Sequence, residues 1–317
     1  PGSSRGRSQH AGERALVLRR MKRYPESLQL YEQAAEAAQN YSGALAHAHW
    51  VGKQGGLQRL MGDLVSARTA YETARDLFTA LGEQGRAGLA DQEGNLGLLA
   101  HDLGDEEGAE KCYRQAVDLA VAANDRDLVN TWATNLGNAL TRKRLYHEAW
   151  SLYSQAMNAA LALNDPKMIF NSAEDWSISY RRAYRWREAA ETQINAADNI
   201  PELTPKCHLL ETALVDLRAA GAWDRILDVG EMLNNLLRIH NPDPERLRRV
   251  EEIRAEAQET LAPTHPVPTP EPGVTTTLAT FVALNMDRYQ KSGNIEGLRQ
   301  VAHLICDVGL GLMNATH

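Results

Sequence analysis

The sequence predicts an all-α fold, a solenoid built from helix-turn-helix repeats. A short phrase recurs at a near-constant interval, small residues recur in phase with it, and apolar side chains follow a helical stripe. The phrase is Tyr-x-x-Ala, and its four copies begin, 40, 42 and 40 residues apart, at Tyr31, Tyr71, Tyr113 and Tyr153. A period near 40 residues is typical of units that cannot bury their apolar faces alone and therefore stack on their neighbours.

Small residues mark where the two helices of each unit are expected to meet. In the second helix a small residue lies four positions before the tyrosine; the fifth copy keeps Ala189 and Ala196 but has Gln193 in place of the aromatic residue. These small residues of the second helix are Ser27, Ala67, Ala109, Ala149 and Ala189. Twelve positions before them, in the first helix, lie Ala15, Gly55, Gly97, Gly137 and Ser177. Because small side chains let two backbones approach closely, the phrase is interpreted as the packing half of the repeat, with no role toward a ligand.

These positions divide the chain into elements in order. The solenoid is predicted over residues 1–261, with five repeats at 8–41, 42–83, 84–125, 126–165 and 166–203, a degenerate sixth helix pair at 204–240 and a charged capping helix at 245–261. Five prolines within residues 262–273 predict an extended linker over 262–275. Residues 276–317 are predicted to form a C-terminal helical hairpin.

The second repeat fits the pattern poorly. Gln54 and Gln58 fall on the face that should be buried, and glycines stand at positions 52, 55 and 56 of the same helix. Each glycine costs a helix about 1 kcal/mol relative to alanine. We therefore expect either a distorted first helix in this repeat or a register that differs from the other repeats.

The repeat resembles the tetratricopeptide repeat, most clearly at Asn95-Leu-Gly97 and at Asn135-Leu-Gly-Asn138, with Gly62-Asp63 and Gly104-Asp105 at the turns between helices. Units of about 40 residues are similar to those of kinesin light chains, Pins-like polarity adaptors and Rap-like quorum-sensing regulators. The resemblance implies a right-handed superhelix whose concave groove is lined by the first helices of the repeats.

The first helices separate into an apolar arc and a polar arc when each residue is advanced by 100°. The resemblance implies that the polar arc lines the groove, where asparagine amides pair with a peptide backbone and arginines pair with carboxylates. Carried over by position, the groove residues are Lys53, Arg59, Asn95, His101, Asn135, Asn138, Arg142, Arg181 and Arg182. An alternative interpretation is that the asparagines bond to the neighbouring repeat and set the superhelical rotation.

Composition excludes several classes of function. A net charge of −7 disfavours nucleic acid as a partner, and no stretch of the sequence is apolar enough to predict a membrane span. The three cysteines are far apart in the sequence and fit a reducing, cytoplasmic location. No spacing of titratable residues predicts a catalytic site, a metal site or a cofactor, so no enzyme is expected.

The resemblance therefore implies a non-enzymatic interaction module that binds a peptide or protein segment in the groove. The alternative is a sensor or regulatory region of a larger signalling or transcription-control protein, since the chain begins with Pro1 rather than methionine. The linker is long enough for the C-terminal hairpin to reach back and block the groove, or to pack elsewhere. The partner, the pathway and the oligomeric state stay open.

Overall fold

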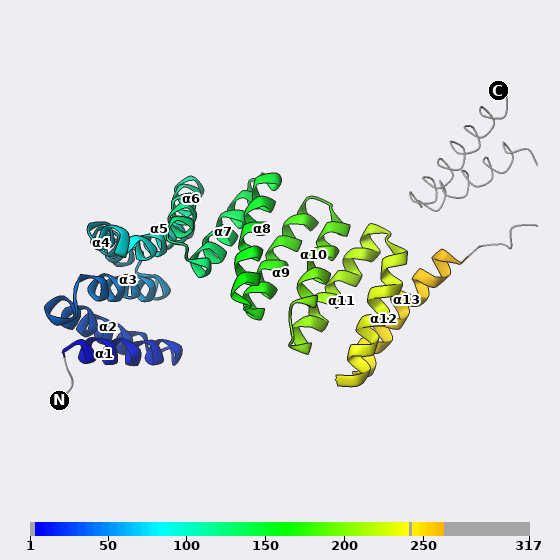
Figure 1. The fold of residues 1–317 in the computed structure, drawn as a ribbon, viewed down its shortest axis with the longest axis horizontal. Helices are drawn as coiled ribbons and strands as arrows, with labels where there is room; N and C mark the ends of the chain where they lie inside the picture. Colours follow the sequence, from blue (N-terminus) through cyan, green and yellow to red (C-terminus); the bar gives the residue numbers. More distant parts are fainter. Residues whose placement is uncertain (1–3, 241–242, 263–317) are drawn as a thin grey trace, which may run out of the picture.

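A computed structural model describes residues 4–240 and 243–262 of the chain. These residues form thirteen α-helices and no β-strand, and the helices stack one after another from the N-terminus to α13 (Figure 1). The all-α solenoid expected from the sequence is confirmed. The proline-rich linker beyond residue 262 and the C-terminal hairpin lie outside the described residues.

The helices follow one another as six pairs and a final single helix. The first helix starts at residue 4, whereas the first repeat is predicted from residue 8. Their bounds are α1 (Ser4–Arg20) and α2 (Tyr24–Ala37), α3 (Ala44–Leu60) and α4 (Leu64–Ala80), α5 (Arg86–Asp102) and α6 (Glu106–Ala122), α7 (Arg126–Arg142) and α8 (Tyr146–Leu163), α9 (Pro166–Arg182) and α10 (Trp186–Asp198), α11 (Leu203–Ala220) and α12 (Trp223–His240), and α13 (Pro244–Leu261).

Aspartates begin several of these helices, as the sequence of the turns suggests. The Asp63 side chain accepts a hydrogen bond from the backbone N–H of Ser66, and Asp105 does the same with Gly108, which satisfies donors that the first turn of a helix leaves free. The residues before them, Gly62 and Gly104, have φ of +82° and +78°, a left-handed conformation that glycine adopts without steric cost.

The recurring tyrosines form the centre of the packed interior. Tyr31, Tyr71, Tyr113 and Tyr153 are all buried to 2% exposure or less, and the alanines three residues after them are fully buried. A glycine of the first helix lies against three of these rings: a Cβ at Gly55, Gly97 or Gly137 would stand 2.8, 2.7 or 2.9 Å from the ring of the tyrosine in its own repeat. The small residues are therefore where the second helix inserts its aromatic side chain against the first.

Neither alternative expected for repeat two is found, because α3 is a regular helix and Gly55 packs on Tyr71 as Gly97 packs on Tyr113. Helix α3 runs without interruption through all three glycines. A Cβ at Gly55 would stand 2.8 Å from the ring of Tyr71, and a Cβ at Gly52 would stand 2.7 Å from the side-chain oxygen of Gln92 in the next repeat. Close packing on both sides therefore offsets the low helix propensity of glycine.

The last helix, α13, covers the end of the stack. Val250 and Ala257 are buried in the same apolar cluster as residues of α11 and α12. Its other face carries exposed ion pairs within the helix, Arg249 with Glu245 and Arg248 with Glu252. Among residues 4–240 and 243–262, no helix is both long and apolar enough to span a bilayer.

Candidate functional site

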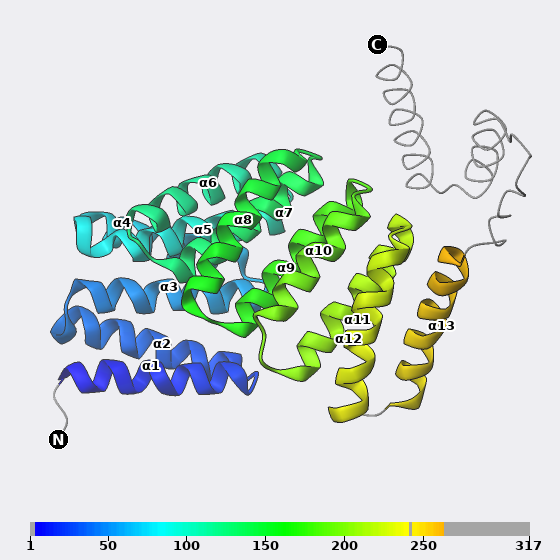
Figure 2. The ribbon, with the colours of Figure 1, turned by 45° about the vertical axis from the view of Figure 1, so that its right-hand side comes forward.

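Two adjoining cavities lie along the first helices of the third, fourth and fifth repeats, α5, α7 and α9, whose positions in the stack are labelled in Figure 2. Helices α5 and α7 contact each other, as do α7 and α9, so consecutive first helices share this face. The two cavities have Asn135, Asn138 and Asp175 in common and therefore adjoin each other, and together they are called the depression below.

The first cavity, of about 280 Å³, lies toward the C-terminal ends of these helices, and we call it the basic cavity. It contains His101, Arg142 and Arg182 beside the apolar side chains of Leu98 and Ile178. Five of the nine residues predicted for the groove meet here. The full lining is Leu98, His101, Tyr113, Asn135, Asn138, Thr141, Arg142, Asp175, Ile178 and Arg182.

The second cavity, of about 350 Å³, lies nearer the N-terminal halves of α7 and α9, and we call it the acidic cavity. Its charged residues are Glu174 and Asp175, and four of its other residues are asparagines. The full lining is Asn130, Thr131, Thr134, Asn135, Asn138, Asn171, Ser172, Glu174 and Asp175. Two neighbouring carboxylates in a partly buried wall repel each other, and a cation bound between them relieves that repulsion.

Asn138 lies where the two cavities meet, and a hydrogen bond from Tyr153 of α8 orients its side-chain amide. The hydroxyl of Tyr153 donates to Asn138 Oδ1 at 2.7 Å. That bond orients the amide, whose N–H side donates a hydrogen bond to Asp175 in the wall that the two cavities share. Asn135 differs, because its Nδ2 donates to the backbone oxygen of Thr131 in its own helix at 2.8 Å.

The acidic cavity perturbs the ionisation of Asp175. Burial raises the pKa of Asp175, a hydrogen bond from Asn138 opposes that rise, and the neighbouring charge of Glu174 adds to it. Glu174 Oε1 and Thr134 Oγ1 are buried and have no hydrogen-bond partner among the described residues. A buried polar atom without a partner costs on the order of 1–3 kcal/mol, so these atoms favour a ligand that reaches them.

The basic side chains of the basic cavity differ in whether they already have a hydrogen-bond or ion-pair partner within the protein. Glu106 accepts from His101 Nδ1 at 2.8 Å and from Arg142 Nη2 at 3.1 Å. Although partial burial opposes ionisation, these hydrogen bonds lower the pKa of Glu106. The exposed Arg182 forms no side-chain ion pair within the described part of the chain, and its backbone oxygen accepts from Tyr146 at 3.1 Å.

The other four predicted groove residues line neither cavity. Arg59 pairs with Asp102 of the next repeat at 2.7 Å, and Arg181 pairs with the buried Asp216 at 3.0 Å. These two arginines tie neighbouring first helices together, as the alternative interpretation proposed for the asparagines. Lys53 and Asn95 lie near Asp91, where Lys53's charge and an Asn95 hydrogen bond oppose the rise that burial causes in the pKa of Asp91.

Sequence reasoning missed Asn130, Asn171 and Ser172, because they lie outside the part of the polar arc that was carried over to the groove, near the small residue of each first helix. Asn130 and Ser172 are almost fully buried, and Asn130 Nδ2 donates to Ser172 Oγ at 2.8 Å. One signal in the sequence could have found Ser172. Five residues before the small residue of the first helix, repeats two to four have the long side chains of Trp50, Gln92 and Trp132, whereas the fifth repeat has Ser172.

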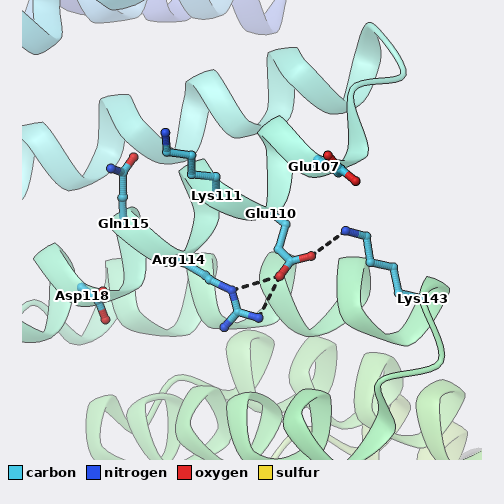
Figure 3. Close-up of a pocket in the computed structure, with 7 residues that line it drawn as sticks. All are labelled: Glu107, Glu110, Lys111, Arg114, Gln115, Asp118 and Lys143. Carbon is cyan, nitrogen blue, oxygen red and sulfur yellow. Dashed lines mark hydrogen bonds and ion pairs between the residues drawn. The ribbon is translucent and has the colours of Figure 1, made fainter.

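A larger cavity, of about 460 Å³, lies on the second helix α6 and is shown in Figure 3. Three of its charged side chains form a network, in which Glu110 accepts from Arg114 at 2.8 Å and from Lys143 at 2.6 Å (Figure 3). Glu107, Lys111 and Asp118 line the same cavity outside this network. The hydrogen bond from Lys143 is the main reason that the pKa of Glu110 is lowered. The network of Glu110, Arg114 and Lys143 therefore fastens α6 to the end of α7.

Among residues 4–240 and 243–262, no group of three or more histidine, cysteine, aspartate or glutamate side chains is placed to hold a metal ion. Cys112 and Cys207 are free, and burial raises the pKa of both thiols, which disfavours the reactive thiolate.

Comparisons with known proteins agree with this architecture. Family models for the tetratricopeptide repeat match residues 6–80 and residues 94–120. No curated protein matches the chain in sequence.

Three solved structures are similar in fold. BtubC (BKLC) from P. vanneervenii has 14% identity and a TM-score of 0.51, over 86% of this chain and 98% of that one. Aspartyl phosphate phosphatase F from Bacillus subtilis has 10% identity and a TM-score of 0.53, over 81% and 71%. A Rap protein complexed with Competence and Sporulation Factor has 15% identity and a TM-score of 0.51, over 80% and 76%. At these identities the similarity concerns the fold alone.

Proposed function

The chain contains tetratricopeptide repeats, at residues 6–80 and 94–120, and from that premise we propose that it is a non-enzymatic interaction module that binds an extended peptide segment of a partner protein. The observation that carries the proposal is the depression along α5, α7 and α9, in which five of the predicted groove residues meet.

The chemistry of this depression suits an extended segment. An extended backbone presents N–H and C=O groups that no neighbouring strand satisfies, and asparagine amides can pair with both. Asn138 stands between the two cavities with its orientation fixed by Tyr153. Arg182, whose guanidinium is exposed, and Arg142 beside it supply charge-assisted hydrogen bonds for a carboxylate. One of the similar folds, the Rap protein, was solved with a bound factor, which is consistent with this use of the architecture.

A variant of the groove tests the proposal. A phage-displayed library of random nine-residue peptides is panned on the wild-type full chain, and the selected peptides are measured by fluorescence anisotropy. Asn138→Ala with Arg142→Ala should weaken binding roughly tenfold to a hundredfold, because it removes an amide and a charge-assisted contact.

Lys111→Ala is the matched control, because Lys111 is an exposed residue of α6 that lines the separate cavity of Figure 3. This control should bind as the wild type does. Unchanged affinity of the groove variant, with an unchanged circular-dichroism spectrum, would show that peptides bind elsewhere. Failure of the wild type to select any peptide would refute the proposed function.

A further inference from the structure

We propose that the acidic cavity receives a lysine or arginine side chain of the bound segment, and that the basic cavity receives an aspartate or glutamate three positions away in the same segment. This inference rests on the proposed function and assigns the chemistry of the partner. It follows from the origin of the acidic cavity, from the groups in its walls, and from its distance to the basic cavity.

The acidic cavity lies at the first junction between first helices where a packing pair seen at the three preceding junctions is missing. At the three preceding junctions a glycine of one first helix faces a long side chain of the next. A Cβ would stand 2.2 Å from the facing ring at Gly12 and at Gly94, and 2.7 Å from the facing amide at Gly52. The pairs are Gly12 with Trp50, Gly52 with Gln92, and Gly94 with Trp132.

The corresponding residues between the fourth and fifth repeats are Thr134 and Ser172. Neither side chain is large enough to replace an indole ring, and the space between α7 and α9 is the cavity of about 350 Å³. A side chain supplied by a partner can therefore occupy the position that the chain's own tryptophan fills at the neighbouring junction.

The walls of the cavity select a cation rather than an aromatic ring. Glu174 and Asp175 place two adjacent carboxylates there, and Asn130, Asn135, Asn138 and Asn171 add amide groups. His208 Nε2 of α11 stands 3.9 Å from Glu174 Oε2, which is outside hydrogen-bond distance. Glu174 Oε1 and Thr134 Oγ1 remain without partners in the described residues, and a guanidinium or ammonium group donates the hydrogen bonds that such oxygens accept.

The two cavities lie along the same helices, which sets the spacing of the partner's charges. Asp175 of the acidic cavity and Arg182 of the basic cavity are seven residues apart on α9, a separation of about 10 Å along the helix axis. A segment in the polyproline II conformation covers about 9 Å in three residues and returns to the same face after each third residue. The expected pattern is therefore a basic and an acidic residue three positions apart, with Asn138 pairing with the backbone between them.

The test uses the full chain and the same library of random nine-residue peptides. The wild type should enrich lysine or arginine paired with aspartate or glutamate at a spacing of three. Glu174→Gln with Asp175→Asn, which keeps the shape of both side chains, should lose the basic preference and retain the acidic one. For a selected peptide, replacing its basic residue by alanine should weaken binding at least tenfold to the wild type and less than twofold to this variant.

A second variant, Thr134→Gly with Ser172→Trp, recreates the pair seen between Gly94 and Trp132 and should abolish the basic preference by filling the cavity. If it fails to fold, as judged by circular dichroism, the isosteric variant decides the question alone. Wild-type selection of peptides without a basic residue, or an unchanged basic preference in the isosteric variant, would overturn the inference and leave the proposed function standing. If the wild type selects no peptide, both are wrong.

Discussion

Tyr153 connects the packing of the repeat to the candidate site. The Tyr-x-x-Ala phrase is predicted from the sequence to serve packing alone, and the burial of the ring agrees with that role. Its hydroxyl, however, donates to Asn138 Oδ1 at 2.7 Å and lies 3.3 Å from Thr141 Oγ1, which in turn lies 2.8 Å from Ser179 Oγ. The polar end of a core residue therefore orients the amide that we propose binds the peptide backbone.

We predict that Tyr153→Phe lowers stability by about 1 kcal/mol, the usual net value of one hydrogen bond, and also weakens peptide binding because Asn138 loses its fixed orientation. Tyr71→Phe is the matched control: the Tyr71 hydroxyl is buried without a partner in the described residues, so its removal should leave stability unchanged or slightly raised. Chemical denaturation and fluorescence anisotropy measure the two effects. If Tyr153→Phe and Tyr71→Phe had the same stability and the same peptide affinity, Tyr153 would have no role in orienting Asn138.

At the scale of the helix, glycines have two different uses along this chain. Gly94 permits the buried ring of Trp132 to lie against the backbone of α5, with atoms of that ring as close as 2.2 Å to where a Cβ would stand. Gly56 in α3 has only the hydroxyl of Tyr71 near it, at 3.6 Å, which is an ordinary contact. The same residue type is thus required for packing at one position and replaceable at the other.

Gly94→Ala should therefore destabilise the protein by about 1–2 kcal/mol, because the cost of displacing a buried indole exceeds the gain in helix propensity. Gly56→Ala should stabilise it by up to about 1 kcal/mol, since the propensity gain meets no steric opposition. Thermal unfolding followed at 222 nm compares the two variants directly. A stabilised Gly94→Ala variant would mean that the packing between first helices is looser than the distances indicate.

The helices and their order could be predicted from the sequence because the signal repeats. Tyr31, Tyr71, Tyr113 and Tyr153 occupy equivalent positions, so each copy supports the assignment of the others. The interruption expected in repeat two was wrong because propensity is local, whereas Gly52 and Gly55 are explained by contacts with Gln92 and Tyr71.

The candidate site was only partly predictable, because it depends on exceptions to the repeat. The polar arc selected Asn138 and Arg142, which both line the basic cavity. It could not show that Arg181 is committed to Asp216, because that pairing depends on a charge in the next repeat. Nor could it find the acidic cavity, which lies at the junction where Ser172 replaces a long side chain.

At the scale of the whole molecule, the solenoid has ends, and α13 covers one of them. In a stack of repeats each unit contacts only its neighbours, so the last pair needs a covering element to bury its outer apolar side chains. Val250 and Ala257 supply that cover and belong to the apolar cluster of α11 and α12. Energetic coupling in such an array decays along the stack, and damage at one end should stay local.

We predict that Val250→Asp with Ala257→Asp detaches α13 because it places two charges in an apolar interface. Hydrogen exchange should then accelerate in α11, α12 and α13 and remain unchanged in α1 to α4, and size-exclusion chromatography should show concentration-dependent association through the uncovered surface. Arg248→Ala with Glu252→Ala removes an exposed ion pair from the opposite face of the same helix and should change neither measurement. Faster exchange throughout the described helices would instead mean that the array unfolds as one cooperative unit.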